Sequence, residues 1–266
     1  MKNYNLVEFI NKLEDEFPSC LAEDWDNVGL QIANENIIIN NVLITLDITS
    51  DVIEYAKEKK FNLIISHHPL IFSPIYSIIA FNNYLSHLIK ELLLYNIAVF
   101  VIHTNLDKIY FELLSQMFNL KNIKPIKEEI NYSLKAGTGS YGELSYEITL
   151  KELLEMVKKK LNIEKLKYVG DLNKRVKIIG TCGGTGTSLI NEGLTKKGID
   201  VLITADLKYH TALNAKQLGI AVIDAGHYHT EKILLPHLRK KLINLFSDTK
   251  ISFEVSNFIT DPLNFY

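Results

Sequence analysis

Histidines follow each of three short apolar runs in this sequence, and carboxylates follow two of these runs. The apolar runs cover residues 63–65, 97–102 and 220–223. The residues that follow them are His67 and His68, then His103 and Asp107, and finally His227, His229 and Glu231. Side chains placed just past the carboxyl end of a strand are able to reach a ligand or a metal. A single histidine in such a place more often caps a strand or packs at a sheet edge, but three such segments together favour one shared metal site.

Five of these residues form a donor set that suits divalent metal ions. They are His67, His68, Asp107, His227 and Glu231. Imidazole and carboxylate donors without a thiolate pair exclude a closed cysteine-rich zinc site and favour a catalytic site with open positions. Five ligands are more than a single catalytic zinc takes, and they suit two ions bridged by a carboxylate. Glu231 lies four residues after His227 and shares a face of a helical turn with it, so we expect Glu231 to be the bridge.

The donor types predict two divalent ions per chain, and they allow zinc, manganese or iron. Two ions ~3.5–4 Å apart can lower the pKa of a shared water and polarise the bond that it attacks. The candidate catalytic residues are His103 and His229. His103 could orient Asp107 or carry protons, or it could be a hydrogen-bonded histidine at a strand end. His229 could be a general acid near the metals. We expect His210 to be structural or to contact a ligand residue rather than a metal.

The spacing of the apolar residues predicts alternating strands and helices. Strands are expected at 42–47, 63–66, 97–102, 176–181, 201–204, 220–223 and 251–255. Helices are expected over 6–17, 51–59, 83–95, 149–161, 188–197 and 209–218. Residues 137–144 are rich in glycine and predict a turn that leads into a short strand. The alternation is typical of an α/β fold with a mostly parallel sheet covered by helices.

Two halves of the chain resemble each other. Residues 42–47 align with 176–181, 63–68 with 201–206, and 96–107 with 219–231. We interpret this as an internal repeat that builds two similar α/β lobes with mixed, mostly parallel sheets covered by helices. The first lobe would be residues 1–125 with 232–266, and the second would be residues 126–231. Two such lobes facing each other would bring their strand ends to a cleft, and the metal site is expected in that cleft.

The amino-acid composition argues against a nucleic-acid-binding protein, a disulfide-rich protein and a membrane protein. The chain has 266 residues, is 47% hydrophobic and carries a formal net charge of −2. Only Arg175 and Arg239 are arginine, and reading of bases or phosphates relies on arginine, so we expect no nucleic-acid partner. Cys20 and Cys182 lie far apart and suggest no disulfide framework. The first residues lead into an amphipathic segment rather than a signal sequence, and no apolar run approaches a membrane span. We therefore expect a cytoplasmic protein without a membrane partner.

Two loops allow alternative interpretations. Residues 22–31 contain the single tryptophan, Trp25, and form either a surface turn anchored by that residue or a roof over a site. Residues 182–188 are rich in glycine and join a strand to a helix. Their backbone N–H groups could bind an anion, or the glycines could serve a tight turn that lets helix and strand pack closely. The second alternative is favoured, because the segment does not match a phosphate-binding fingerprint.

Several segments together resemble the Nif-three-like family, whose members are labelled GTP cyclohydrolase I type 2 homologues. The segments are 25–31 (WDNVGLQ), 66–72 (SHHPLIF), 103–107 (HTNLD), 226–228 with Glu231, and 260–262 (TDP), together with the glycines at 137–142 and 182–186. They occur in order from about residue 5 to the end. The resemblance implies a two-lobed α/β fold, a dinuclear metal site between the lobes and a ring-shaped homohexamer. By position, the ligands of the family fall on the same five residues as above.

No extra domain lies between the two lobes, so the chain resembles the short form of the family. We expect a metal-dependent hydrolase that acts on a nucleotide-like or phosphorylated small molecule. A non-catalytic, metal-binding hexameric scaffold or interaction protein is the alternative, because the ligands come without a dedicated nucleophile.

Overall fold

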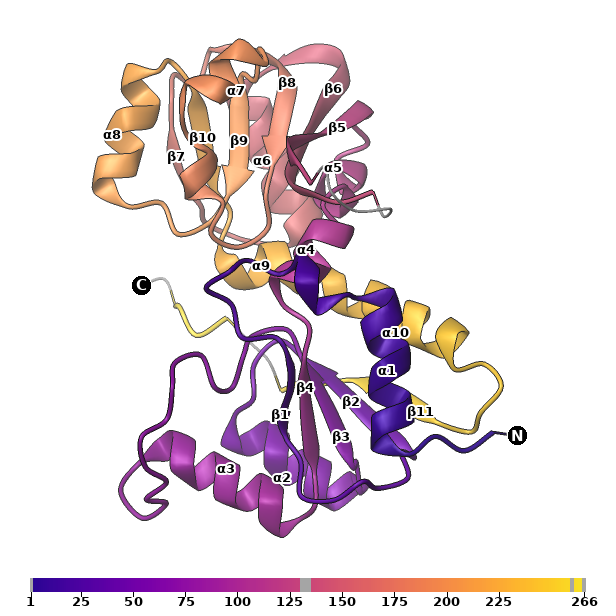
Figure 1. Ribbon diagram of the computed structural model, residues 1–266. Helices are drawn as coiled ribbons and strands as arrows, with labels where there is room; N and C mark the ends of the chain where they lie inside the picture. The colour runs from indigo at the N-terminus through magenta and orange to yellow at the C-terminus, as the bar shows by residue number, and fades with distance from the viewer. Residues whose placement is uncertain (1, 130–134, 259–260, 265–266) are drawn as a thin grey trace. The chain divides into compact units, whose positions relative to one another are not determined.

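The computed structural model describes residues 2–129, 135–258 and 261–264, and it has an α/β architecture with two mixed sheets (Figure 1). The chain divides into two compact units. The first unit is Met1–Leu106 with Leu235–Thr260, and the second is Asp107–Leu234 with Asp261–Tyr266. Each unit contains one of the sheets, covered by helices. The predicted α/β class, with mixed sheets covered by helices, is therefore confirmed.

The sheet of the first unit is mostly parallel. Its strands, in spatial order, are β1 (Gly29–Ile32), β4 (Ala98–Val101), β3 (Leu63–Ser66), β2 (Asn41–Thr45) and β11 (Ser252–Val255). Strands β4, β3, β2 and β11 are parallel to their neighbours, whereas β1 pairs with β4 in the antiparallel direction. Strands β3 and β4 are buried along their whole length because both faces of the sheet are covered.

Helices cover this sheet on both sides. The helices of the first unit are α1 (Leu6–Glu16), α2 (Ser50–Lys59), α3 (Tyr84–Leu94) and α10 (Leu234–Leu245), and a short 3-10 helix covers Ser19–Leu21. The Thr49 side chain caps α2, because it accepts a hydrogen bond from the backbone N–H of Val52. On the other side, the ring of Phe9 in α1 stacks on Phe246 beyond α10, with centroids 4.1 Å apart.

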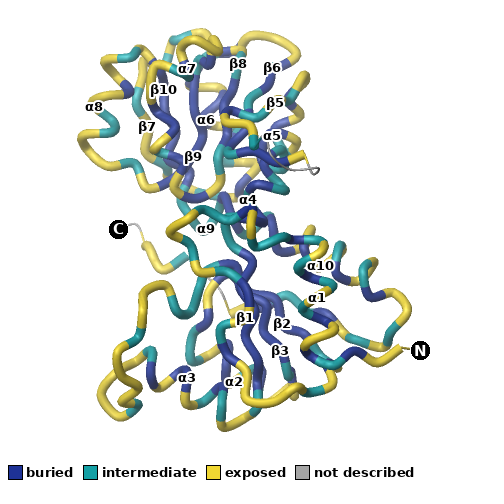
Figure 2. The backbone as a smooth tube through the Cα atoms, in the orientation of Figure 1, coloured by how far each residue is buried: buried dark blue, intermediate teal, exposed yellow. Residues whose placement is uncertain are grey.

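The sheet of the second unit has a parallel centre and antiparallel flanks. Its strands, in spatial order, are β5 (Lys121–Glu128), β6 (Gly137–Thr149), β8 (Arg175–Thr181), β9 (Val201–Thr204), β10 (Ala221–Asp224) and β7 (Lys167–Val169). Strands β8, β9 and β10 are parallel, and β7 pairs with β10 in the antiparallel direction. The central strands of both sheets are buried (Figure 2).

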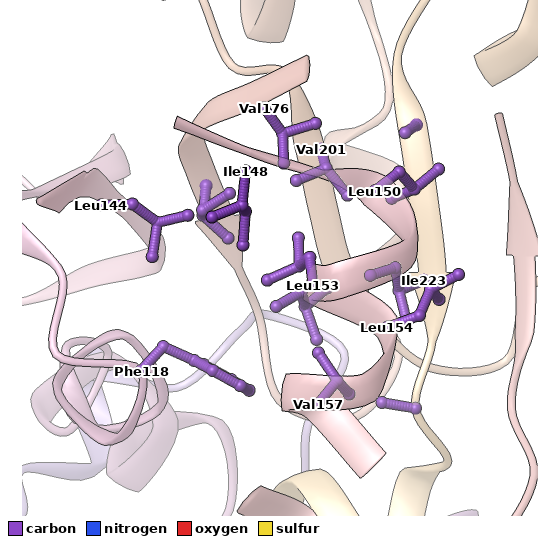
Figure 3. Close-up of a cluster of buried hydrophobic side chains, with 14 of the residues drawn as sticks. Phe118, Leu144, Ile148, Leu150, Leu153, Leu154, Val157, Val176, Val201 and Ile223 are labelled. Carbon is purple, nitrogen blue, oxygen red and sulfur yellow. The ribbon is translucent and has the colours of Figure 1, made fainter. Parts of the chain in front are cut away.

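Helix α6 (Leu150–Leu161) packs on one face of the second sheet. Its Leu153, Leu154 and Val157 belong to the same apolar cluster as Val201 and Ile223 of the strands (Figure 3). Further helices of this unit are α4 (Thr104–Ile109), which begins in the first unit, α5 (Leu113–Met117), α7 (Glu192–Lys196), α8 (Tyr209–Gln217) and α9 (His227–Glu231). Because the spacing of the apolar residues in α6 follows the helical period, this helix agrees with its prediction.

Two predictions of local structure are wrong. Residues 137–144 are not a turn but the first part of the long strand β6, whose glycines permit a close approach of β5. At Gly137 a Cβ atom would lie 2.6 Å from Cβ of Pro125, so a larger residue does not fit there. The helix expected over 188–197 is instead a 3-10 turn (Thr187–Leu189) followed by the short α7. The Asn191 side chain accepts a hydrogen bond from the backbone N–H of Gly193, so α7 begins there as a separate helix.

The two sheets share a pattern. In the first sheet β2, β3 and β4 are parallel neighbours and β1 is antiparallel to β4; in the second sheet β8, β9 and β10 are parallel neighbours and β7 is antiparallel to β10. In each case the candidate ligands follow the carboxyl ends of these parallel strands. The internal repeat itself stays a prediction. Throughout the described ranges, no helix combines the length and the apolar character that crossing a membrane requires.

Candidate metal centre

Three histidines of the first unit converge at the carboxyl ends of β3 and β4. His67 and His68 follow β3, and His103 follows β4 immediately before α4. Each ring offers a nitrogen, and the three nitrogens lie within 4.8 Å of one another. The backbone N–H of His67 donates to Thr45 and that of His68 donates to Leu46, so the path of the strand holds both residues in place. This cluster can bind a divalent ion.

Each of these histidines makes the same kind of hydrogen bond through Nδ1. The pairs are His67 with the carbonyl oxygen of Ile102 at 3.1 Å, His68 with Asp47 at 2.8 Å, and His103 with Asp26 at 2.8 Å. A carbonyl or carboxylate oxygen can only accept, so Nδ1 must be the donor. In the neutral ring the lone pair then lies on Nε2, which is the tautomer that a metal ligand needs.

Asp26 is the most strongly held of these partners. Its side chain is fully buried and accepts hydrogen bonds from His103 and from both the backbone N–H and the hydroxyl group of Thr104. Burial raises the pKa of Asp26, but these hydrogen bonds outweigh it and bring the pKa down to about 2. Asp26 is therefore an anion at neutral pH and keeps the Nδ1 proton on His103.

The second unit has a set of candidate ligands of its own: Asp107 in α4 and the pair His227 and Glu231 in α9. The carboxylate of Glu231 lies 3.0 Å from Nε2 of His227 and offers an oxygen within 4.8 Å of one from Asp107. Glu231 is 3% exposed. The predicted placement of His227 and Glu231 on one helical face is thus observed. Nδ1 of His227 donates to Asp206 at 2.7 Å, which repeats the hydrogen-bond pattern of the first unit.

The charges of this second set fit a cation. The hydrogen bond to Glu231 raises the pKa of His227 to about 9, although burial opposes the shift. A proton therefore bridges His227 and Glu231, and a divalent ion would replace it, since ligand histidines lose a proton when a metal binds. Burial, followed by the charges of Asp107 and Glu231, raises the pKa of Cys182 to about 12. In the metal-free chain its thiol is therefore protonated at neutral pH.

The glycine-rich loop after β8 packs directly beneath His227 and Glu231. Gly184 has a φ of +55°, and a Cβ atom at this position would lie 2.1 Å from Oε1 of Glu231 and 3.3 Å from Nε2 of His227. The backbone N–H of Gly184 donates to the hydroxyl group of Thr230 at 3.0 Å. This geometry supports the interpretation as a tight turn for close packing, and the turn leaves room for the Glu231 carboxylate.

The other predicted histidines lie elsewhere. His229 occupies the opposite face of the α9 turn from His227, and its ring nitrogens lie 3.2 Å from Asp261 and 3.3 Å from Lys232. Burial, and then the positive charge of Lys232, lower the pKa of His229. His210 is exposed on α8. Within the matching segment TDP, Thr260 lies outside the described residues.

Sequence reasoning missed the three carboxylates that hold the ligand histidines: Asp26, Asp47 and Asp206. A signal for two of them is present in the sequence. Asp47 lies two residues after the end of β2, and Asp206 lies two residues after the end of β9. Each of these strands pairs with the strand that precedes a ligand histidine. Asp26 has no such local signal, because its partner His103 is 77 residues away.

Comparisons with known proteins give the family of the chain. The family profile of Duf34/NIF3 (NGG1p interacting factor 3) matches residues 4–262. A protein of Clostridium acetobutylicum named GTP cyclohydrolase 1 type 2 homolog is 36% identical over 245 residues, covering 88% of both chains. A protein of Clostridium perfringens with the same name is 32% identical, covering 98% of this chain and 99% of the relative.

Among solved structures, a hypothetical protein of Staphylococcus aureus superposes with a TM-score of 0.91 at 31% identity, and all of both chains is covered. Sequence and fold therefore point to the same group of proteins over nearly the whole length of the chain. The chain belongs to the Duf34/NIF3 family.

Proposed function

We propose that this protein is a dinuclear metal-dependent hydrolase acting on a nucleotide-like or phosphorylated small molecule. One observation carries the proposal: the three clustered histidines of the first unit, and His227 of the second unit, all direct Nδ1 to a carbonyl or carboxylate oxygen and therefore leave Nε2 to act as a ligand atom. Strand-end histidines that merely cap a sheet have no need of one shared tautomer, whereas ligands of a metal do.

The chain connects the two ligand sets through one short segment. His103 precedes α4 directly, and Asp107 lies in the second half of that helix. We propose that His67, His68, Asp107, His227 and Glu231 together hold two divalent ions, with zinc, manganese and iron as the candidates. Glu231 is the proposed bridge, because it contacts His227 and lies near Asp107.

The roles of the residues follow from their surroundings. Bound divalent ions would activate a water molecule and polarise the bond under attack. Asp26 and Asp206 hold His103 and His227 in the required tautomer. We propose His103 and His229 as proton carriers.

The substrate class is supported by the family. Curated relatives are named GTP cyclohydrolase 1 type 2 homologs, a name that refers to a nucleotide reaction. Cleavage of a ring or ester bond by water is compatible with a site of two ions. We also propose a homohexamer, as the family resemblance implies, which sedimentation equilibrium would measure against the 30.4 kDa chain.

A turnover screen tests the proposal. The full chain is stripped with a chelator, reloaded with Zn²⁺, Mn²⁺ or Fe²⁺, and assayed against nucleotides and phosphoesters. Metal-dependent turnover that Glu231→Gln abolishes is the expected result. Tight binding of the metals with no turnover on any of these compounds would instead favour the non-catalytic scaffold.

A further inference from the structure

We propose that Trp25 and Phe72 form a binding platform for a planar heteroaromatic ring of the substrate beside the His103 end of the metal centre. The inference deepens the proposed function by naming the ring as the recognised part of the substrate, and it rests on that function for the reaction. All of the residues that carry it belong to the first unit of the chain.

Two large aromatic side chains lie exposed beside the ligand histidines. Trp25 is 59% exposed and Phe72 is 56% exposed. Their ring centroids are 6.0 Å apart with the planes inclined by 50°, so neither ring covers the face of the other. The Trp25 ring is also 6.0 Å from the ring of His103, in an edge-to-face arrangement. A ligand on these rings would therefore be adjacent to a candidate metal-ligating histidine.

The backbone beneath this pair is held by side chains rather than by strand pairing alone. The backbone N–H of Ile71 donates to Oε1 of Gln31 at 2.8 Å, and Nε2 of Gln31 donates back to the Ile71 carbonyl at 3.1 Å. Nδ2 of Asn27 donates to the same carbonyl oxygen at 2.6 Å. The Trp25 loop and the Phe72 segment are thus joined by three hydrogen bonds.

A second anchor holds the residue next to Trp25. The side chain of Asp26 is fully buried and accepts hydrogen bonds from His103 and Thr104. These two anchors fix the backbone after Trp25, while the rings of Trp25 and Phe72 remain more than half exposed. Exposed aromatic rings on a fixed backbone lose little conformational freedom on binding, so this arrangement suits recognition rather than packing.

The geometry favours a flat ring over other ligands. Every nucleobase-like ring has a π face that stacks on tryptophan or phenylalanine, and stacking requires no particular hydrogen-bond partner. The side chains of Trp25 and Phe72 offer aromatic faces and no charged group, so the platform would select for the ring of the ligand rather than for its phosphate. The phosphate or the bond to be cleaved would then extend toward the histidine cluster.

The single tryptophan of the chain makes the test direct. Fluorescence of Trp25 is titrated in the full, chelator-treated protein with guanosine monophosphate, adenosine monophosphate and, as the ring-free match, ribose 5-phosphate. We expect both mononucleotides to quench the emission and ribose 5-phosphate to leave it unchanged. Phe72→Ala should weaken mononucleotide binding about 5- to 150-fold, the range found for loss of one stacking partner.

Two further variants complete the experiment. Equilibrium dialysis should show that Trp25→Phe keeps most of the binding and that Trp25→Ala loses it. Tyr76→Ala removes an aromatic ring that is 99% exposed on the same loop and should leave binding unchanged. Equal losses in Tyr76→Ala and Phe72→Ala would overturn the platform, as would unchanged binding in Trp25→Ala.

The outcomes separate this inference from the proposed function. Mononucleotide binding through Trp25 without any turnover would support the platform and reject the hydrolase. Turnover without quenching or loss of binding in the variants would reject the platform alone. A changed sedimentation coefficient in Trp25→Ala, with ring binding unaffected, would assign the pair to contact between copies of the chain and overturn the inference.

Discussion

At the scale of single residues, Glu231 is the carboxylate on which the second ligand set depends. It is almost completely buried, contacts His227 at 3.0 Å and lies near Asp107. If it bridges two ions it offsets their repulsion, so Glu231→Ala should lower the metal content more than His103→Ala or His229→Ala. Elemental analysis of the three variants after dialysis measures this, and full metal occupancy in Glu231→Ala would remove the residue from the ligand set.

The same variants separate ligands from proton carriers. His229→Ala should retain its metals, because the His229 ring lies at Asp261 and Lys232 rather than at the ligand atoms. Any hydrolytic rate should fall by ~10²–10⁴ if His229 transfers a proton. Loss of metal from this variant would contradict the assigned role.

Gly184 gives a second prediction at the residue scale. In Gly184→Ala the new Cβ would lie 2.1 Å from Oε1 of Glu231, at a φ of +55°, so the carboxylate must move. We expect a variant that folds less stably and binds less metal. Gly183→Ala is the matched control, since the nearest atom to its Cβ would be the Thr230 carbonyl oxygen at 3.4 Å. Isothermal titration with Zn²⁺ compares the two, and equal affinities would refute the steric argument.

At the scale of elements, the start of α6 is set by a reciprocal cap. The hydroxyl group of Thr149 accepts from the backbone N–H of Glu152, and the carboxylate of Glu152 accepts from the backbone N–H of Thr149. Thr149→Ala should lower the free energy of unfolding by ~1 kcal/mol. Urea denaturation followed by circular dichroism measures the change, and an unaltered midpoint would show that packing alone positions α6.

The cap also predicts a pH dependence. Hydrogen bonds from the backbone and hydroxyl group of Thr149 lower the pKa of Glu152 below its usual 4.5. A carboxylate with a depressed pKa contributes stability above the pKa of the unfolded chain, and the contribution disappears as the pH falls through the folded value. The stability difference between wild type and Glu152→Gln should therefore be present at pH 7 and decrease as the pH falls below 4.5 and through the folded-state pKa. A difference that persists in acid would contradict this assignment.

At the scale of the whole molecule, metal binding should raise the stability of the folded chain. Ions that bind only the native state contribute ~2.7 kcal/mol at a concentration of 100 Kd. For a chain of this size that corresponds to a rise in Tm of ~5–10 °C. Differential scanning calorimetry with and without a chelator measures the shift, and elemental analysis should find two ions per chain. One ion or none at saturating metal would reject the dinuclear site.

Much of the framework was determined by the sequence alone, because it depends on neighbours along the chain. Strand β3 is an apolar run that ends at Ser66 directly before His67 and His68, and α6 follows a helical period after a capping threonine. These local signals placed the candidate ligands at strand ends. The motifs spread along the chain were sufficient to predict the family.

Tertiary structure decided the features that join distant residues. The tautomer of His103 depends on Asp26, which is 77 positions away, and no local sequence pattern predicts the hydrogen bond between them. Glycines in β6 predicted a turn, but the close approach of β5 makes them part of a strand. The exposed position of Trp25 beside Phe72 likewise follows from hydrogen bonds between two separate loops. Local periodicity reports which residues share a face, whereas packing and hydrogen bonds between distant segments determine what each face meets.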